Sequence, residues 1–303
     1  MKKIYDKLET AGIFGLLIAI KNYVLPHRLR EYSRFKDLFQ SKIGLEIGGP
    51  SKRMFGREGH IPIYPIASRI DNCNFSRNTI WEGKVDEGDN FIFNKRVAPG
   101  RQYICEASNL GFVKDSSYDF ILSSHCVEHL ANPLKAVTEW VRVLKEGGLL
   151  VLVIPHKDGT FDHRRLVTSL EHLISDLVND TDEGDLFHME EILRSHDLER
   201  DPGAGDFKSF QARSNRNFEN RGLHHHVFDT SLVIEMVDFM RLQILTVEPF
   251  CPFHIAVIAR KVIPNQMVCN RKFKSDDAKH NFFSPFPSDR MAHHRVGPIS
   301  LPS

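Results

Sequence analysis

Apolar runs alternate with a helical pattern through the middle of the chain. Residues 43–51 (IGLEIGGPS) form a short apolar run that ends in an acidic residue, two glycines and a proline. This pattern predicts a buried strand followed by a tight turn. Residues 118–122 (YDFIL) and 149–154 (LLVLVI) predict two more strands, and residues 132–144 predict a helix between them, with Asn132 as its N-cap. Near-continuous apolar strands around a helix indicate a parallel sheet that is covered on both faces.

The first 42 residues predict a helical N-terminal segment. Apolar residues recur at helical spacing between residues 29 and 39, and residues 11–20 form an apolar run (AGIFGLLIAI). This run is about half as long as a bilayer span requires, and Asp6 and Glu9 before it are untypical of a secretory signal. We therefore expect a helix that packs on the domain or makes peripheral contact with a membrane surface.

The chain between residue 156 and its end has a different character. Residues 156–229 are polar and hold eight of the 16 histidines, which suggests an insertion over the edge of the sheet. Residues 230–242 predict a helix capped by Asp229, and residues 243–250 and 253–260 predict an antiparallel closing pair of strands. Periodicity then fades, so residues 43–261 form the expected main domain and residues 262–303 a flexible tail.

Composition and charge exclude several classes of protein. Hydrophobic residues at 41% and charged residues at 26% are typical of a folded globular chain. Forty basic residues stand against 39 acidic ones without a basic stripe, so we expect no nucleic-acid partner. The five cysteines are scattered and odd in number, which favours reduced thiols and a cytoplasmic location.

Candidate binding residues follow the predicted strands, because an open α/β sheet binds ligands beyond the carboxyl ends of its strands. Glu46, Gly48 and Gly49 end the first strand, and the glycines let the backbone approach a ligand closely. Asp71 follows some 23 residues after Gly48, about where such folds place a carboxylate that binds ribose hydroxyls.

These residues form an ordered set with Glu106 and Ala107, with residues 119–129 (DFILSSHCVEH) and with residues 142–148 (RVLKEGG). The set resembles the type 11 family of class I S-adenosylmethionine-dependent methyltransferases. The resemblance covers residues 43–155 and, by pattern only, residues 230–260. It implies a doubly wound, mostly parallel, Rossmann-like sheet of seven strands with an antiparallel last strand. The chain departs from the family at Pro50 and Ser51, where a third glycine is usual.

The resemblance also implies roles for individual residues. S-adenosylmethionine would be the cofactor, with Glu46, Gly48 and Gly49 beside its methionine half and Asp71 at its ribose. Glu106 and Ala107 would lie beside the adenine. The residues expected beneath the sulfonium are Ser123, Ser124 and His125. Glu128 and His129 recur so widely in the family that we expect them to be structural.

Histidines are the candidate groups on the acceptor side. Methyl transfer from a sulfonium needs mainly an in-line nucleophile at about 3 Å, and a hydroxyl nucleophile benefits from a base near neutral pKa. His156 follows the strand at residues 149–154 and is the first candidate, and His163 lies in a D-H-R-R run that could also clamp an anion. Adjacent side chains point in different directions, so the triplet at residues 224–226 predicts no metal site.

The sequence therefore predicts an S-adenosylmethionine-dependent methyltransferase that acts on a small-molecule or saccharide acceptor, preferably at oxygen, with residues 156–229 as a substrate lid. Two alternatives remain open. One is an NAD-dependent Rossmann oxidoreductase or epimerase, which the missing G-x-G-x-x-G disfavours. The other is a non-catalytic S-adenosylmethionine-binding protein. The acceptor and the oligomeric state stay undetermined at this point.

Overall fold

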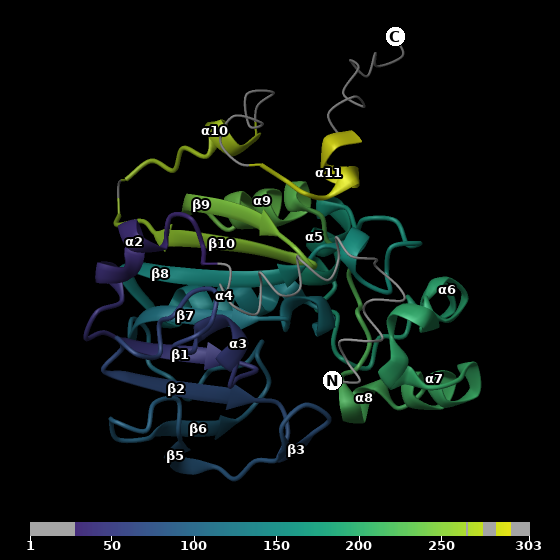
Figure 1. Cartoon of the computed structure of the whole chain (residues 1–303), viewed down its shortest axis with the longest axis horizontal. Helices are drawn as coiled ribbons and strands as arrows, with labels where there is room; N and C mark the ends of the chain where they lie inside the picture. Colours follow the sequence, from purple (N-terminus) through teal and green to yellow (C-terminus); the bar gives the residue numbers. More distant parts are fainter. Residues whose placement is uncertain (1–27, 265, 275–282, 292–303) are drawn as a thin grey trace, which may run out of the picture.

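The computed structural model describes residues 28–264, 266–274 and 283–291, in which one large sheet runs through the molecule (Figure 1). Its strands lie in the order β5 (Gly88–Phe91), β6 (Gly100–Ile104), β2 (Arg69–Asn74), β1 (Ile43–Ile47), β7 (Tyr118–Ser124), β8 (Leu144–Pro155), β10 (His254–Lys261) and β9 (Leu242–Phe250). Neighbours from β6 to β8 are parallel, whereas β10 is antiparallel to β8 and β9. The mostly parallel sheet with an antiparallel last strand is confirmed. It has eight strands rather than seven, because the short polar strand β5 adds an antiparallel edge to β6.

The helices next to the sheet begin where the sequence places their caps. In α4 (Pro133–Val143), the side chain of Asn132 accepts a hydrogen bond from Lys135 N. In α9 (Thr230–Phe239), Asp229 accepts from Leu232 N in the same way. Both helices end one to three residues before the predicted ends, because β8 and β9 begin at Leu144 and Leu242. A side-chain cap satisfies an orphan N–H of the first turn and thereby fixes the start of the helix.

Both faces of the sheet are covered, as predicted, but by different structures. The helices α4, α5 (Leu170–Val178) and α9 cover one face, where Trp140 is fully buried. Short segments cover the other face: α2 (Tyr32–Phe35), the 3-10 turn η1 (Lys36–Leu38), α3 (Lys52–Phe55) and the coil after it. Alternate residues of β7 serve the two cores, with Ile121 in the first and Phe120 and Leu122 in the second, as the two-residue period of a strand requires.

The N-terminal helix predicted at residues 29–39 is present as α2 and η1 and is shorter than expected. Its apolar positions Leu29, Phe35 and Phe39 are buried against the second core. The apolar run at residues 11–20, with its expected membrane contact, lies outside the described residues. Within the described part of the chain, no helix is long and apolar enough to cross a membrane.

The insertion at residues 156–229 divides into two parts. Its first helix, α5, packs on α4 and α9 and so belongs to the covered face of the sheet. The remainder extends beyond the arrowheads of β1 and β2, beside the small hairpin of β3 (Asn78–Thr79) and β4 (Gly83–Lys84) (Figure 1). Its elements are η3 (Lys157–Gly159), α6 (Met189–Ser195), η4 (Leu198–Arg200), η5 (Pro202–Ala204), α7 (Phe207–Ser214) and α8 (Asn217–Asn220).

Parts of the predicted tail contact the domain. In the described residues after 262, two short helices are present, α10 (Arg271–Lys274) and α11 (Pro287–Met291). Asn270 donates to Leu242 O at 2.9 Å, and the buried Asp289 accepts from Thr230 Oγ1 at 2.6 Å. Each of these contacts is made by one polar side chain to a residue that is distant in the sequence. No periodic pattern in the sequence therefore predicts it.

Candidate functional site

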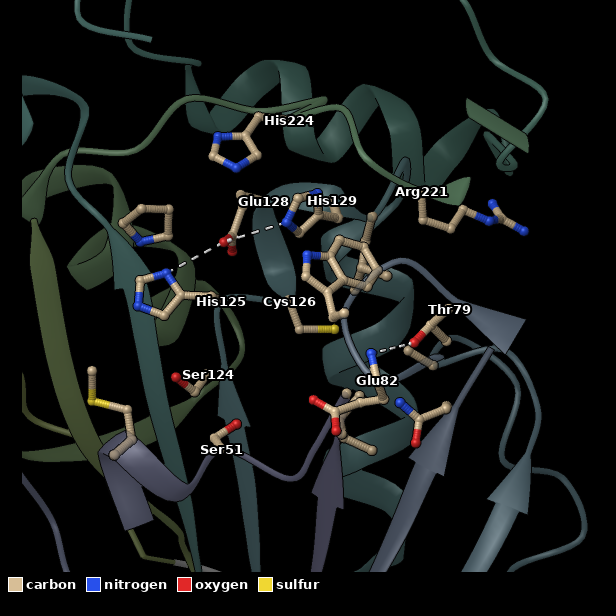
Figure 2. Close-up of a pocket in the computed structure, with 18 of the residues that line it drawn as sticks. Ser51, Thr79, Glu82, Ser124, His125, Cys126, Glu128, His129, Arg221 and His224 are labelled. Atoms are coloured by element: carbon tan, nitrogen blue, oxygen red, sulfur yellow. Dashed lines mark hydrogen bonds and ion pairs between the residues drawn. The ribbon is translucent and has the colours of Figure 1, made fainter. Parts of the chain in front are cut away.

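A cavity of about 1020 Å³ opens at the carboxyl ends of the parallel strands. One wall comes from the residues that follow β1, β2, β6 and β7, and we call it the sheet wall. The opposite wall comes from the insertion, chiefly Phe161, Asp201, Arg221 and His224, and we call it the insertion wall. Figure 2 shows the two walls facing each other, with Ser51 and Ser124 on one side and His224 on the other.

The turn after β1 is held from behind by Glu46. Its buried carboxylate accepts from Ser51 N at 2.8 Å and from the Tyr64 hydroxyl at 2.5 Å. Burial raises the pKa of Glu46 to about 7. Gly49 lies against this carboxylate, and a Cβ there would come within 2.3 Å of it. Gly48 has a φ of +76° and lines the cavity, so the predicted glycines serve two different purposes.

The second strand places its polar residues differently from the prediction. Asp71 pairs in register with Leu45, inside the strand, and its carboxylate accepts from Arg69 Nε at 2.7 Å and from the Tyr118 hydroxyl at 2.9 Å. Asp71 is buried and does not line the cavity. Asn74, the last residue of β2, does line it. Of the two residues, Asn74 reaches the cavity and Asp71 does not.

Glu106 and Ala107 both line the cavity after β6, as predicted. Ala107 O accepts from the indole N–H of Trp140 at 2.9 Å, which fixes this corner to the core. Glu106 is 2.6 Å from Arg221 of the insertion, and Arg221 also pairs with Glu183 at 2.7 Å. Burial raises the pKa of Glu106, and Arg221 opposes this shift. The ion pair joins the sheet wall to the insertion wall.

Two of the three residues predicted at the end of β7 reach the cavity. Ser124 and His125 line it, whereas Ser123 is buried behind them. His125 has a left-handed backbone, with a φ of +52°, and its Nε2 lies 2.9 Å from His254 Nδ1. A left-handed conformation is rare for a residue with a side chain and often accompanies a functional site.

Glu128, His129 and His224 form a buried cluster on the far side of the cavity, and all three line it (Figure 2). Glu128 Oε1 lies 3.8 Å from His129 Nε2. Burial alone would raise the pKa of Glu128, but His125 and His129 hold it below its ordinary value. Burial lowers the pKa of His129 to about 4. Glu128 and His129, which the resemblance implies are structural, both face the cavity.

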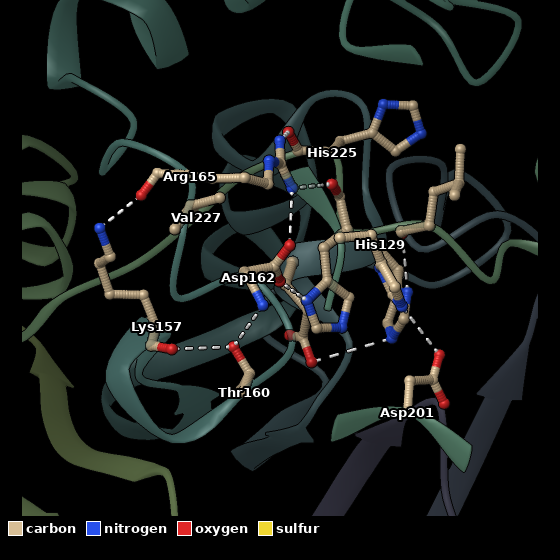
Figure 3. A network of polar contacts seen from close by, with 12 residues as sticks. His129, Lys157, Thr160, Asp162, Arg165, Asp201, His225 and Val227 are labelled. Carbon is tan, nitrogen blue, oxygen red and sulfur yellow. Dashed lines mark hydrogen bonds and ion pairs between the residues drawn. The ribbon is translucent and has the colours of Figure 1, made fainter. Parts of the chain in front are cut away.

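A polar network behind His224 fixes its position (Figure 3). His224 Nδ1 contacts the carboxylate of Asp162, and Arg165 pairs with the same carboxylate at 3.0 Å. Arg165 also donates to His224 O at 2.8 Å. Burial alone would raise the pKa of Asp162, but His224 and Arg165 outweigh it and hold the pKa at about 2. For His224, burial alone would lower the pKa, and Asp162 raises it above the ordinary value.

The two histidines predicted as catalytic lie elsewhere. His156 is fully buried, with its Nε2 3.0 Å from Asp289 Oδ1 and its ring stacked on Phe286. His163 Nε2 lies 2.7 Å from Asp197 Oδ2. Neither histidine lines the cavity. Pro155, at the end of β8, lines the cavity. The side chain of His156, the next residue, contacts Asp289 of the tail instead.

The sequence analysis did not identify several residues of the cavity. They include Trp81, Glu82, Arg221 and His254. The only signal for His224 was its place in a histidine triplet, and nothing local linked it to Asp162, which lies 62 residues away.

Residues 84–152 match the family model described as a methyltransferase domain. No curated protein matches the chain.

Three solved structures illustrate the similar folds. An S-adenosylmethionine-dependent methyltransferase from Methanosarcina mazei is 15% identical, with a TM-score of 0.43, over 78% of this chain and 99% of that one. One from Aquifex aeolicus is 13% identical, with a TM-score of 0.39, over 77% and 90%. The 1,6-didemethyltoxoflavin-N1-methyltransferase of Burkholderia thailandensis is 12% identical, with a TM-score of 0.43, over 77% and 78%.

Proposed function

We propose that this chain, whose residues 84–152 match a methyltransferase domain, uses S-adenosylmethionine to methylate a hydroxyl group of a small-molecule or saccharide acceptor. The acceptor would bind between the cofactor and the insertion wall. The observation that carries this proposal is the placement of His224, which lines the cavity while Asp162 holds its Nδ1 from behind. The five free cysteines support a reaction in a reducing compartment such as the cytoplasm.

The sheet wall fits S-adenosylmethionine. Gly48 presents bare backbone to the cavity, because it has no Cβ at a φ of +76°. We assign the methionine half to this turn, the ribose to Asn74 and the adenine to the corner at Glu106 and Ala107. Glu82 supplies a further carboxylate to this part of the cavity, near Ser51 and Thr79 (Figure 2). When bound, the cofactor supplies a methyl group already activated by a sulfonium.

The protein's own residues then position the acceptor and exclude water. Ser124 and His125 line the cavity at the end of β7, and His224 would position the acceptor hydroxyl from the insertion wall. These residues would hold the acceptor oxygen in line with the methyl group, and the hydroxyl proton would leave to water. Trp81, whose side chain is 52% exposed at the cavity, offers a flat apolar surface for a ring.

The test is a labelled-methyl assay of the full chain against a fractionated extract, with His224→Gln compared with His163→Gln. We expect His224→Gln to lower turnover about a hundredfold, while the dissociation constant for S-adenosylmethionine stays within about twofold. His163→Gln should leave both unchanged, because His163 lies outside the cavity. Full turnover in the His224 variant, or a labelled product without an O-methyl group, would contradict the proposal.

A further inference from the structure

We propose that Glu128, His129 and His224 bind a divalent transition-metal cation on the acceptor side of the cavity. The cation would in turn bind the hydroxyl oxygen of the acceptor, and only this second step rests on the proposed function. One ligand atom from each of the three residues lies within 4.8 Å of the other two. Ligand atoms around one tetrahedral zinc ion lie roughly 3.3 Å apart, so side-chain shifts of about 1 Å would close the site.

Both histidines are already oriented as metal ligands. His129 Nδ1 lies 2.9 Å from Leu223 O, and since a carbonyl only accepts, Nδ1 carries the proton and Nε2 offers its lone pair. His224 Nδ1 contacts the carboxylate of Asp162 in the corresponding way. Metal-binding histidines characteristically donate their second ring N–H to a carbonyl or a carboxylate. These partners occupy Nδ1 in both histidines, so Nε2 is the ring nitrogen left to bind a cation.

Glu128 supplies the independent observation. Its side chain is 1% exposed, and its Oε2 has no hydrogen-bond partner among the described residues. Its Oε1 lies 3.6 Å from His125 Nδ1 and 3.8 Å from His129 Nε2, beyond hydrogen-bond length. A buried carboxylate oxygen without a donor is costly, and a cation at this point would satisfy it. The cluster therefore offers a cation three ligands, one of them a buried carboxylate whose Oε2 lacks a hydrogen-bond donor among the described residues.

The ligand set indicates which cations fit and what they would do. Two imidazoles and one carboxylate leave coordination positions open toward the cavity, a set that Zn²⁺, Co²⁺, Fe²⁺ and Mn²⁺ can occupy. Bound to the acceptor, the cation would act as a Lewis acid and lower the pKa of the hydroxyl. The proton then leaves to water, the oxygen attacks the methyl carbon, and the C–S pair stays on sulfur. The cation keeps its oxidation state throughout.

The insertion contains a second histidine cluster that serves as an internal control. His172, His188 and His226 also lie within 4.8 Å of one another. None of the three lines the cavity, so a cation there could not reach the acceptor. Substitutions in this cluster are matched in chemistry to those in the proposed site, and they separate specific binding from general affinity of histidines for metals.

The experiment uses the full chain, stripped with EDTA and titrated separately with Zn²⁺, Co²⁺ and Mn²⁺ by calorimetry, with metal content measured after dialysis. Wild type should bind one of these cations with a dissociation constant below about 10 µM. Glu128→Gln combined with His224→Gln should lose about a hundredfold in affinity, and Asp162→Asn should lose roughly ten- to a hundredfold. His172→Gln combined with His188→Gln should keep the cation. Calorimetry with S-adenosylmethionine checks that each variant is folded.

Three results would overturn the inference. The first is a wild type that binds none of the three cations more tightly than about 100 µM. The second is binding that survives in the Glu128 and His224 variant, and the third is binding that only the His172 and His188 variant loses. Failure of the proposed function looks different: the cation binds as described, but the product carries no O-methyl group. O-methylation that EDTA leaves intact would overturn the role of the cation in the transfer and leave the proposed function standing.

Discussion

The two walls of the cavity are built in different ways. The sheet wall is held by neighbours in sequence and in register: Gly48 N donates to Cys73 O at 2.8 Å, and Glu46 holds Ser51 N. The insertion wall is held by polar pairs between distant residues, such as Arg165 with His224 O and Arg221 with Glu106. The sheet wall is therefore set by the fold itself, whereas the insertion wall can change its side chains while the fold persists. Cofactor binding should depend on the first wall and acceptor chemistry on the second.

The largest effect expected is on cofactor binding when Gly48 becomes valine. A β-branched side chain at a φ of +76° is strained and projects toward the cavity, so S-adenosylmethionine affinity should fall more than about a hundredfold in calorimetry. Gly147→Val is the matched control, because Gly147 has a φ of +75° in open space away from the cavity. It should lose a similar amount of stability and bind the cofactor normally. Equal affinity in the two variants would remove the turn at Gly48 from the site.

A second prediction concerns the pH dependence of the sheet wall. The folded-state pKa of Glu46 is raised from 4.5 to about 7, so folding favours its protonated form. Its contribution to stability is fully present below pH 4.5 and is lost as the pH rises through about 7. The difference in unfolding free energy between wild type and Glu46→Gln should therefore fall by about 3 kcal/mol from pH 4.5 to about pH 8 in urea titrations. A constant difference would show that Glu46 keeps an ordinary pKa.

The ion pair between the two walls should show a smaller effect. Arg221→Met leaves the carboxylates of Glu106 and Glu183 without their cation, and should weaken S-adenosylmethionine binding about tenfold. A double-mutant cycle with Glu106→Gln should give a coupling energy of about 1 to 2 kcal/mol in the unfolding free energy. Additive effects of the two changes would mean that the pair does not join the walls.

The smallest effects on catalysis are expected at the two histidines predicted from sequence. His156→Ala should lower the unfolding free energy by about 1 to 3 kcal/mol, because it removes one of the hydrogen-bond partners of the buried Asp289. His163→Ala should change it by less than about 0.5 kcal/mol. Turnover per folded molecule should stay unchanged in both. A hundredfold loss of turnover in either variant would show that this histidine takes part in the methyl transfer.

The sheet was predictable because its signals are local. Apolar runs locate β1, β7 and β8, and side-chain caps locate α4 and α9. Which residue of β2 reaches the cavity was not predictable, because sequence spacing does not give strand register. Asp71 lies opposite Leu45 within β2, and the strand continues to Asn74 before it reaches the cavity. The edge strand β5 is short and polar, so no apolar pattern marks it.

Most site residues on the acceptor side of the cavity could not be predicted from the sequence. His156 follows β8 as predicted, but Asp289, 133 residues later in the chain, holds its ring away from the cavity. His224 is a candidate site residue only because Asp162 and Arg165 hold it in place. Glu128 is a candidate only because the fold brings it close to His224. Such pairs are formed by tertiary packing, which a single sequence does not reveal.

The most direct measurement is calorimetric titration of S-adenosylmethionine and of NAD into wild type, Asn74→Ala and His224→Gln. The account predicts that wild type binds S-adenosylmethionine and not NAD. Asn74→Ala should weaken binding of S-adenosylmethionine about tenfold through the unpaired ribose hydroxyls, and His224→Gln should change it by less than about twofold. Wild type that binds NAD instead, or a His224 variant that loses as much cofactor affinity as the Asn74 variant, would contradict the division of the cavity into a cofactor wall and an acceptor wall.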